Sequence, residues 1–393
     1  MLFSISIILL SGMLFGWLCK AIGFPTLFGM IIAGIIIGPG CLNLIDASML
    51  SVSGEIRRLA LIIILIRAGL KLDLSDLKKV GRPAILMCFL PACFEIAGMV
   101  LLAPRFLEMN ILDAAILGAV IGAVSPAVIV PRMIRLIDEG YGTKEGIPQM
   151  ILAGASVDDV VVIVLFTTFT GLAKGKGVSV MAFVNIPLSI VIGIASGLLI
   201  GWVLIKWFSN VKLTVTVMGI LFLAVSLLVS TVETKFPMVP FASLIAIMCM
   251  GIAFKKKDGV LAGKLSSLYD KMWTVAEIFL FVLVGASVAV SYLKKAGPAA
   301  VLLILLVLLF RMAGVWICVL KTGLNKKEKT FCMLAYTPKA TVQAAIGGVP
   351  LAMGLSCGEL VLTVSVVAIL LTAPLGAFAI DATYKKSLSH EGR

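Results

Sequence analysis

Histidine is nearly absent from this chain, and the single copy, His390, lies in a polar C-terminal tail. Histidine is the most frequent metal ligand and the side chain that titrates near neutral pH. Histidine-based catalysis or metal ligation within the apolar part of the chain is therefore excluded. The eight cysteines are scattered through hydrophobic segments with no CxxC spacing. This pattern argues against a zinc site and against a disulfide framework.

Charge is also scarce, since only 13% of the 393 residues are charged while 61% are hydrophobic. The mean hydropathy is +1.16. A soluble domain of this composition would expose large apolar patches, so we expect an all-α polytopic membrane protein. Because a spanning helix needs about 20 residues, about thirteen segments fit. They are expected near 2–19, 24–43, 56–70, 84–103, 111–131, 149–172, 180–205, 213–231, 237–254, 272–292, 298–320, 330–353 and 360–380.

The positions of lysine and arginine predict the orientation of the chain. The net charge is +13, and most basic residues fall in the loops after odd-numbered segments and in the tail. By the positive-inside rule the N-terminus lies outside and the C-terminus inside. These charges face anionic headgroups of the lipid bilayer and lack the aromatic interleaving of a nucleic-acid surface. The first segment has no basic n-region, so we expect a spanning helix rather than a signal peptide, in a bacterial-type cytoplasmic (inner) membrane.

Two acidic residues, Asp158 and Asp159, stand side by side in the apolar run from Met150 to Leu172. A carboxylate at this depth costs roughly 2.5 to 3.5 kcal/mol on insertion scales, so such residues mark ion or proton pathways. Neighbours on a helix point about 100° apart, so one carboxylate can face a basic partner while the other faces a cavity. Their proximity makes ionising both expensive, which keeps one proton exchangeable.

An internal repeat relates two parts of the chain at an offset of 216 residues. The segment from Gly69 to Gly81 reappears from Gly285 to Gly297, and both contain Ser-x-Leu-Lys-Lys-x-Gly. The offset covers seven helices, an odd number, so the copies cross the membrane in opposite directions, as in many secondary transporters. We therefore expect one transporter unit over 1–393, with a first half at 56–172 (core helices 84–172), a linking helix at 180–205 and a second half at 272–380 (core helices 298–380).

The same offset makes Glu95 and Arg311 equivalent, one acidic and one basic, each within an apolar helix. Charges related by a two-fold axis can meet near the bilayer midplane, where pairing lowers the cost of burial. A static pair that locks the helices together and a role in transport are both open.

Prolines predict a break within two of the helices. Ser125-Pro126 lies in the fifth segment and Thr337-Pro338 in the twelfth, and proline removes a backbone donor. Unwound backbone at membrane depth is tolerated where it is buried in protein or lines a cavity. Lys339 is placed to neutralise converging C-terminal helix ends. A plain kink, with Ser125 and Thr337 capping free backbone groups, is the alternative.

These residues resemble the cation:proton antiporter superfamily, in its NHA-like sodium/proton antiporter branch. The resemblance rests on the ordered set of Leu-Ile-Arg67-Ala-Gly-Leu, Ser125 to Pro131, Val-Asp158-Asp159 and Pro338 to Gln343. It implies two crossed broken helices, a homodimer, and a core domain that moves against a dimerisation domain. It also implies that Asp159 binds the ion and the proton, and that Arg311 pairs with Asp158 or with Glu95.

We therefore expect secondary exchange of Na⁺, or Li⁺, for H⁺, with no cofactor and no enzymatic activity. Asp159 and Asp158 are the expected Na⁺ ligands, and Ser125 and Thr337 would assist through hydroxyl or backbone oxygens, as suits a hard cation. One alternative is a sodium-coupled organic-anion symporter of the bile-acid-carrier type. Another is an intramembrane aspartyl protease, although its two aspartates must lie on different helices. A passive cation channel is a third.

Overall fold

The computed structural model describes residues 1–71, 81–174, 180–211, 213–236, 241–288 and 290–390. Within these residues the regular structure is helical, apart from one isolated bridge between Tyr141 and His390. The expected all-α membrane architecture is confirmed. In this part of the chain, eight helical segments are long and apolar enough to cross a membrane: Leu2–Ala21, Arg82–Phe106, Ile111–Asp138, Ile147–Ala173, Val191–Asn210, Val215–Val232, Gly297–Cys318 and Gly358–Ser387. The count of thirteen spans stays a prediction.

The chain divides into two compact units, and the first is assembled from Met1–Gly54, Ser75–Ala173 and Ile278–Arg393. It holds both predicted helix breaks and the aspartate pair. Its helices are α1 (Leu2–Ala21), α2 (Thr26–Ile37), α3 (Ala47–Ser51), α6 (Arg82–Met87), α7 (Leu90–Phe106), α8 (Ile111–Ile121), α9 (Pro126–Asp138), α10 (Ile147–Ala173), α15 (Val290–Cys318), α16 (Lys326–Ala335), α17 (Thr341–Ile346), α18 (Val349–Ala352) and α19 (Gly358–Ser387).

The second unit comprises Glu55–Leu74 and Lys174–Glu277. It contains most of α4 (Ser53–Lys71) and α14 (Gly259–Ala286), with α11 (Val180–Asn210), α12 (Val215–Lys235) and α13 (Ser243–Lys257). Arg67 and Lys71 of α4 contact Asp270 of α14 at 2.5 and 2.9 Å. These ion pairs join two helices that are far apart in sequence.

Two of the differences between the observed and the expected helix boundaries have clear physical reasons. The segment expected at 84–103 is two helices, because the backbone leaves the helical conformation at Phe89 (φ −145°) and Pro91 follows in the first turn of α7. Proline fits well in a first turn, because the N–H that it lacks would have no intrahelical acceptor there. The segment expected to start at 272 begins at Gly259 instead, because hydropathy detects the apolar part of a helix and not its polar extension. The predicted repeat loop at 72–80 lies outside the described residues.

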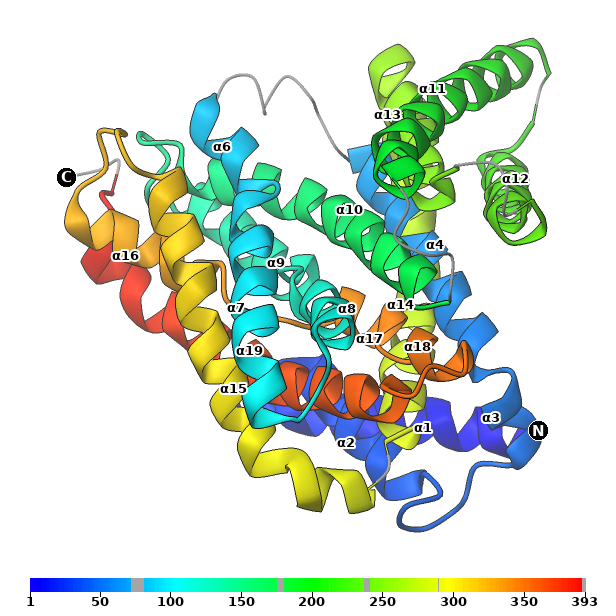
Figure 1. Cartoon of the computed structure of the whole chain (residues 1–393). Helices are drawn as coiled ribbons and strands as arrows, with labels where there is room; N and C mark the ends of the chain where they lie inside the picture. Colours follow the sequence, from blue (N-terminus) through cyan, green and yellow to red (C-terminus); the bar gives the residue numbers. More distant parts are fainter. Residues whose placement is uncertain (72–80, 175–179, 212, 237–240, 289, 391–393) are drawn as a thin grey trace. The chain divides into compact units, whose positions relative to one another are not determined.

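Helices α7 and α15 run side by side in the first unit, as the cyan and yellow ribbons of Figure 1 show. Their packing is reciprocal. A Cβ added to Gly98 would lie 2.7 Å from the Phe310 ring, and one added to Gly314 would lie 3.2 Å from the Phe94 Cβ. Phe94 and Phe310 are themselves separated by the repeat offset, so each helix inserts its phenylalanine against the glycine of the other. This reciprocity is what a local two-fold relationship produces.

Candidate functional site

The non-helical stretch between α8 and α9 begins at the end of α8 and ends at Pro126, the first residue of α9. A proline fits at that position because the first helical N–H groups have no intrahelical acceptor. A second interruption separates α16, which ends at Ala335, from α17. The two interruptions touch, because the Ser125 N–H donates to the carbonyl oxygen of Pro338 at 2.8 Å.

Each interruption leaves backbone carbonyl oxygens without the N–H donors that they would have inside a continuous helix. Arg311, on α15, donates from Nε to the Tyr336 carbonyl at 2.6 Å and from Nη1 to the Gly122 carbonyl. One guanidinium therefore contacts both C-terminal ends, where the helix dipole places partial negative charge. The sequence assigned this task to Lys339, but the Lys339 ammonium contacts Glu95 instead.

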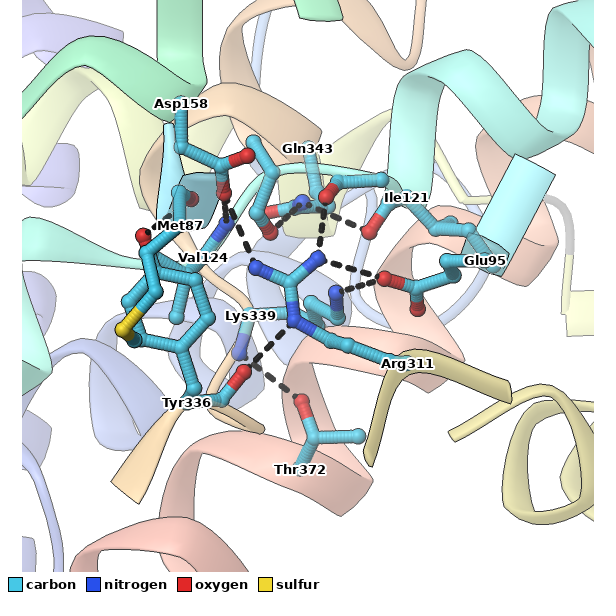
Figure 2. A network of polar contacts seen from close by, with 12 residues as sticks. Met87, Glu95, Ile121, Val124, Asp158, Arg311, Tyr336, Lys339, Gln343 and Thr372 are labelled. Atoms are coloured by element: carbon cyan, nitrogen blue, oxygen red, sulfur yellow. Dashed lines mark hydrogen bonds and ion pairs between the residues drawn. The ribbon is translucent and has the colours of Figure 1, made fainter. Parts of the chain in front are cut away.

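The charged groups form a buried network around Arg311, which Figure 2 shows with its partners. The guanidinium lies 2.7 Å from Glu95 Oε2 and 2.9 Å from Asp158 Oδ2. Lys339 Nζ lies 2.5 Å from the same oxygen of Glu95. The sequence left open whether Arg311 pairs with Glu95 or Asp158, and the structure shows both contacts.

Burial makes this network demanding, since Glu95, Asp158, Arg311 and Lys339 are each at most 1% exposed. Buried charges are stable only when they are paired and hydrogen-bonded. Arg311 makes four hydrogen bonds, which the planar fork of arginine allows and an ammonium group does not. The four charges sum to zero.

Asp158 belongs to the first interruption as well as to the network. Its Oδ2 accepts a hydrogen bond from the Val124 N–H at 2.8 Å, and Val124 lies in the non-helical stretch. The carboxylate thus holds the unwound backbone and the guanidinium together, and Figure 2 shows both bonds reaching the same oxygen.

Within the described structure, Asp159 lacks the ion pair and the backbone hydrogen bond that its neighbour makes. It is 8% exposed, and its Oδ1 is buried without a hydrogen-bond partner among the described residues. No described lysine or arginine lies within ion-pair distance of it, although the preceding residue, Asp158, belongs to the Arg311 network. Asp159 is therefore the one acidic side chain at this site that is left over when the charges of the network are balanced.

The sequence matches, over residues 5–386, the family described as "Sodium/hydrogen exchanger, transmembrane". The chain belongs to this family. It is 34% identical over 376 residues to human "Sodium/hydrogen exchanger 9B2", covering 91% of this chain and 68% of that protein. It is 34% identical to the protein of that name from Xenopus tropicalis (98% and 75% covered) and 31% identical to human "Sodium/hydrogen exchanger 9B1" (93% and 73% covered).

The exchanger fold also has a solved counterpart. The sodium proton antiporter MjNhaP1 from Methanocaldococcus jannaschii, solved at pH 8, superposes with a TM-score of 0.85 over 98% of this chain and 97% of that one, at 19% identity. This likeness establishes the fold. Family membership makes the chain a transporter and not an enzyme, which removes the aspartyl-protease alternative, and it favours exchange over organic-anion symport. Exchangers of this family need no cofactor.

The exchanger brings together most of the residues that the sequence singled out. Ser125 is fully buried at the start of α9, and its hydroxyl has no hydrogen-bond partner in the described part of the chain. Thr337 is 8% exposed, but its hydroxyl donates at 2.8 Å to the Leu334 carbonyl of α16, the helix that precedes it. The two hydroxyls that precede the prolines are thus in different situations.

Sequence reasoning missed four supporting residues of the exchanger. Thr341 and Gln343 are buried and each has an oxygen without a partner among the described residues. Tyr336 packs its ring 5.0 Å from the Arg311 guanidinium carbon and donates its hydroxyl to the Met87 carbonyl at 3.0 Å. Thr372 of α19 accepts the Lys339 N–H at 2.9 Å. The repeat offset of 216 residues pairs Ser125 with Thr341, so Thr341 could have been identified from the sequence.

Proposed function

We propose that this chain exchanges Na⁺, or Li⁺, for H⁺ across the membrane by alternating access, and that Asp159 holds the cation or the proton in turn. The observation that carries the proposal is the buried, unpartnered carboxylate oxygen of Asp159 beside a network whose charges already balance. An isolated carboxylate at this depth is stable only when a proton or a cation neutralises it. It therefore binds one or the other, and occupancy by one displaces the other.

The site offers only oxygen ligands to a cation, which suits hard alkali cations. Asp159 and Asp158 are the proposed charged ligands, and Asp158 has a second oxygen, Oδ1, without a partner in the described structure. Ser125 contributes its free hydroxyl, and Thr337 contributes hydroxyl or backbone oxygen. Pro126 and Pro338 keep the backbone unwound at these positions.

Arg311, Glu95 and Lys339 compensate charge in this proposal. They neutralise the helix ends and hold Asp158 in place, so that the two interruptions keep their shape when the occupant of Asp159 changes. The position of Arg311 between Gly122, Tyr336, Glu95 and Asp158 supports this role.

The larger architecture follows the family pattern in our proposal. The two interrupted helices cross, the halves at 56–172 and 272–380 are inverted copies joined by the helix at 180–205, and the chain forms a homodimer. The unit that carries the site moves as the core domain. The N-terminus lies outside and the C-terminus inside a bacterial-type inner membrane, as the distribution of basic loops indicates.

The test is the pH change that Na⁺, Li⁺ or K⁺ drives in proteoliposomes holding wild type or Asp159→Asn. Asparagine keeps the size of the side chain but cannot carry the charge, so we expect wild-type exchange and its loss in the variant. Asp258→Asn is the matched control, because Asp258 only caps α14 through the Leu261 N–H and asparagine caps a helix equally well.

Exchange that survives in Asp159→Asn would remove Asp159 from the mechanism. Wild-type protein that moves no protons with any of the three cations would overturn the exchange proposal itself and favour cation-coupled symport. Wild type and variants are reconstituted at the same protein density. Size-exclusion chromatography before reconstitution identifies a variant that does not fold.

A further inference from the structure

Three uncharged side chains near the interruptions keep a buried oxygen without a hydrogen-bond partner in the described part of the chain. They are Ser125 (Oγ), Thr341 (Oγ1) and Gln343 (Oε1), which are 0%, 2% and 0% exposed. Buried polar atoms are normally hydrogen-bonded, because leaving one unpaired costs free energy that an apolar side chain of the same size would not. Three such oxygens on residues next to the two interruptions therefore indicate a ligand that supplies the missing contacts.

Ser125 and Thr341 are related by the repeat. Their numbers differ by 216, and each stands where a helix resumes after an interruption, Ser125 before α9 and Thr341 at the first residue of α17. A hydroxyl from each half thus occupies the equivalent place. The pairing by proline, Ser125 with Thr337, is the one that sequence reading suggests, but the Thr337 hydroxyl is already bonded to Leu334.

Gln343 is oriented by its amide nitrogen. Nε2 donates to the carbonyl oxygens of Ala123 at 2.9 Å and Ile121 at 3.3 Å. Both acceptors lie at the end of α8, so the nitrogen is fixed there and the amide oxygen must point away from them. The amide nitrogen of Gln343 is thus hydrogen-bonded, and the amide oxygen is left to contact a ligand.

The contacts of Gln343 lead, through the unwound backbone, to Asp158. Ala123, which it holds, precedes Val124, and the Val124 N–H holds Asp158. Figure 2 shows Gln343 and Asp158 on the same side of the Arg311 guanidinium, next to the unwound stretch. Gln343 and Ser125 therefore lie at the same stretch of backbone as Asp158, and Thr341 is two residues before Gln343 on α17.

We propose that Thr341 Oγ1 and Gln343 Oε1 are uncharged ligands of the exchanged alkali cation and set its selectivity. The inference rests on the proposed function, since it adds ligands to the site of Asp159. Cations differ in the number of oxygens that they take, and ligand number and cavity size decide selectivity between them. Removing one uncharged oxygen weakens binding of the larger cation, Na⁺, more than that of Li⁺.

The experiment measures half-saturating Na⁺ and Li⁺ and the maximal exchange rate in proteoliposomes for Thr341→Val, Thr341→Ser and Gln343→Leu. Valine keeps the shape of threonine without the hydroxyl, and serine keeps the hydroxyl. We expect Thr341→Val and Gln343→Leu to raise half-saturating Na⁺ by about 10-fold and to shift the cation preference toward Li⁺. Thr341→Ser restores the wild-type preference.

Two matched controls separate loss of a ligand from loss of packing. Thr363→Val removes an equally buried hydroxyl that is satisfied by the Glu359 carbonyl at 2.8 Å. Gln149→Leu removes an amide on the Asp159 helix, ten residues or about 15 Å away along the axis. Both controls keep the wild-type cation preference.

A second readout measures binding without transport. A cation that binds only the folded protein raises its melting temperature, so the rise caused by Na⁺ shrinks in Thr341→Val and stays intact in Thr363→Val. A purely structural role would lower the melting temperature equally with and without Na⁺. If Gln343→Leu does not fold, the Thr341 pair decides the question alone.

Wild-type half-saturation for both cations in Thr341→Val would overturn this inference. Asp159→Asn, measured in parallel, keeps the two questions apart. Loss of exchange in Asp159→Asn with unchanged Thr341→Val removes only the uncharged ligands. Retained exchange in Asp159→Asn removes the site itself.

Discussion

The buried charges of the site divide by sign between two parts of the first unit. The acids of the site, Glu95, Asp158 and Asp159, come from α7 and α10, whereas its bases, Arg311 and Lys339, come from α15 and the second interruption. At positions separated by the sequence offset of 216 residues, one part has glutamate and the other has arginine, and these two side chains are in contact.

This comparison shows that side chains of opposite charge can make two parts of one unit dependent on each other. Without the other part, each would bury site charges of one sign, which is prohibitive in an apolar medium. Together they neutralise each other, except for one carboxylate on the acidic side. The excess of a single negative charge, at Asp159, is the property that a transported cation or proton satisfies in the function we propose.

The largest effect is expected when the basic side of the comparison is removed. Arg311→Met leaves Glu95 to Lys339 alone, leaves Asp158 without a cation, and strips both helix ends of their donor. Removing one partner of a buried pair costs about 3–5 kcal/mol, so we expect a large fall in melting temperature and loss of exchange. Thermal unfolding in detergent measures the first.

The control for that variant is Arg135→Met. Arg135 pairs with Asp381 at 2.6 Å but is 45% exposed, and exposed pairs contribute only about 0–1 kcal/mol. Equal melting temperatures for the two variants would contradict a central role for Arg311.

The next effect compares the two aspartates. Asp158→Asn takes the charge from a carboxylate that binds Arg311 and Val124, so stability should fall by about 1.5–3 kcal/mol, the range for hydrogen bonds to charged groups. Asp159→Asn removes a buried charge without a partner, so the melting temperature in cation-free buffer should stay the same or rise. A larger fall for Asp159→Asn would show that our assignment of the balanced and the excess charge is reversed.

A smaller effect tests the reciprocal packing of α7 and α15. A Cβ at position 314 would lie 2.9 Å from the Pro91 Cα, which is backbone, whereas a Cβ at 98 would meet the Phe310 ring. A ring shifts more easily than backbone, so Gly314→Ala should destabilise by about 1–3 kcal/mol and Gly98→Ala by less. Melting temperatures of the two variants give the order directly, and the reverse order would refute it.

The last prediction is that a membrane potential has no effect on the exchange rate. If Asp159 alone alternates between one Na⁺ and one H⁺, each cycle moves no net charge, because Arg311 stays charged. An imposed membrane potential should then leave the Na⁺/H⁺ exchange rate unchanged. A rate that increases steeply with the potential would mean that a second proton site, such as Asp158, also exchanges.

The charged part of the site could be predicted from sequence because charge within apolar segments is conspicuous. Asp158 and Asp159 stand out in their run, and the repeat offset connected Glu95 with Arg311 before any coordinates. The all-α membrane fold followed from composition. What joins the charges did not follow, since the four hydrogen bonds of Arg311 depend on where the interruptions of distant helices meet.

The uncharged residues of the site were harder to predict, because a threonine or glutamine in an apolar helix is common and has no charge that sets it apart. Thr337 drew attention through the proline that follows it, while Thr341 needed the offset to be applied residue by residue. Gln343 ends the Pro338 to Gln343 motif, but that motif does not indicate which of its residues contact an ion. Its importance comes from the absence of a partner for one atom, which only a three-dimensional arrangement reveals.

The position of Arg311 also bears on how the chain is built. An arginine at the centre of a helix entering the bilayer costs roughly 2.5 to 3.5 kcal/mol during insertion. Three of the four hydrogen-bond partners of Arg311, namely Glu95, Gly122 and Asp158, precede it in the chain, and only Tyr336 follows it. The three preceding partners are already synthesised when α15 leaves the ribosome, so the cost need last only until α15 packs on α7. Synthesis of α7 and α10 before α15 therefore shortens the time that the arginine spends unpaired in the bilayer. In a permuted chain that made α15 first, the arginine would be exposed to lipid.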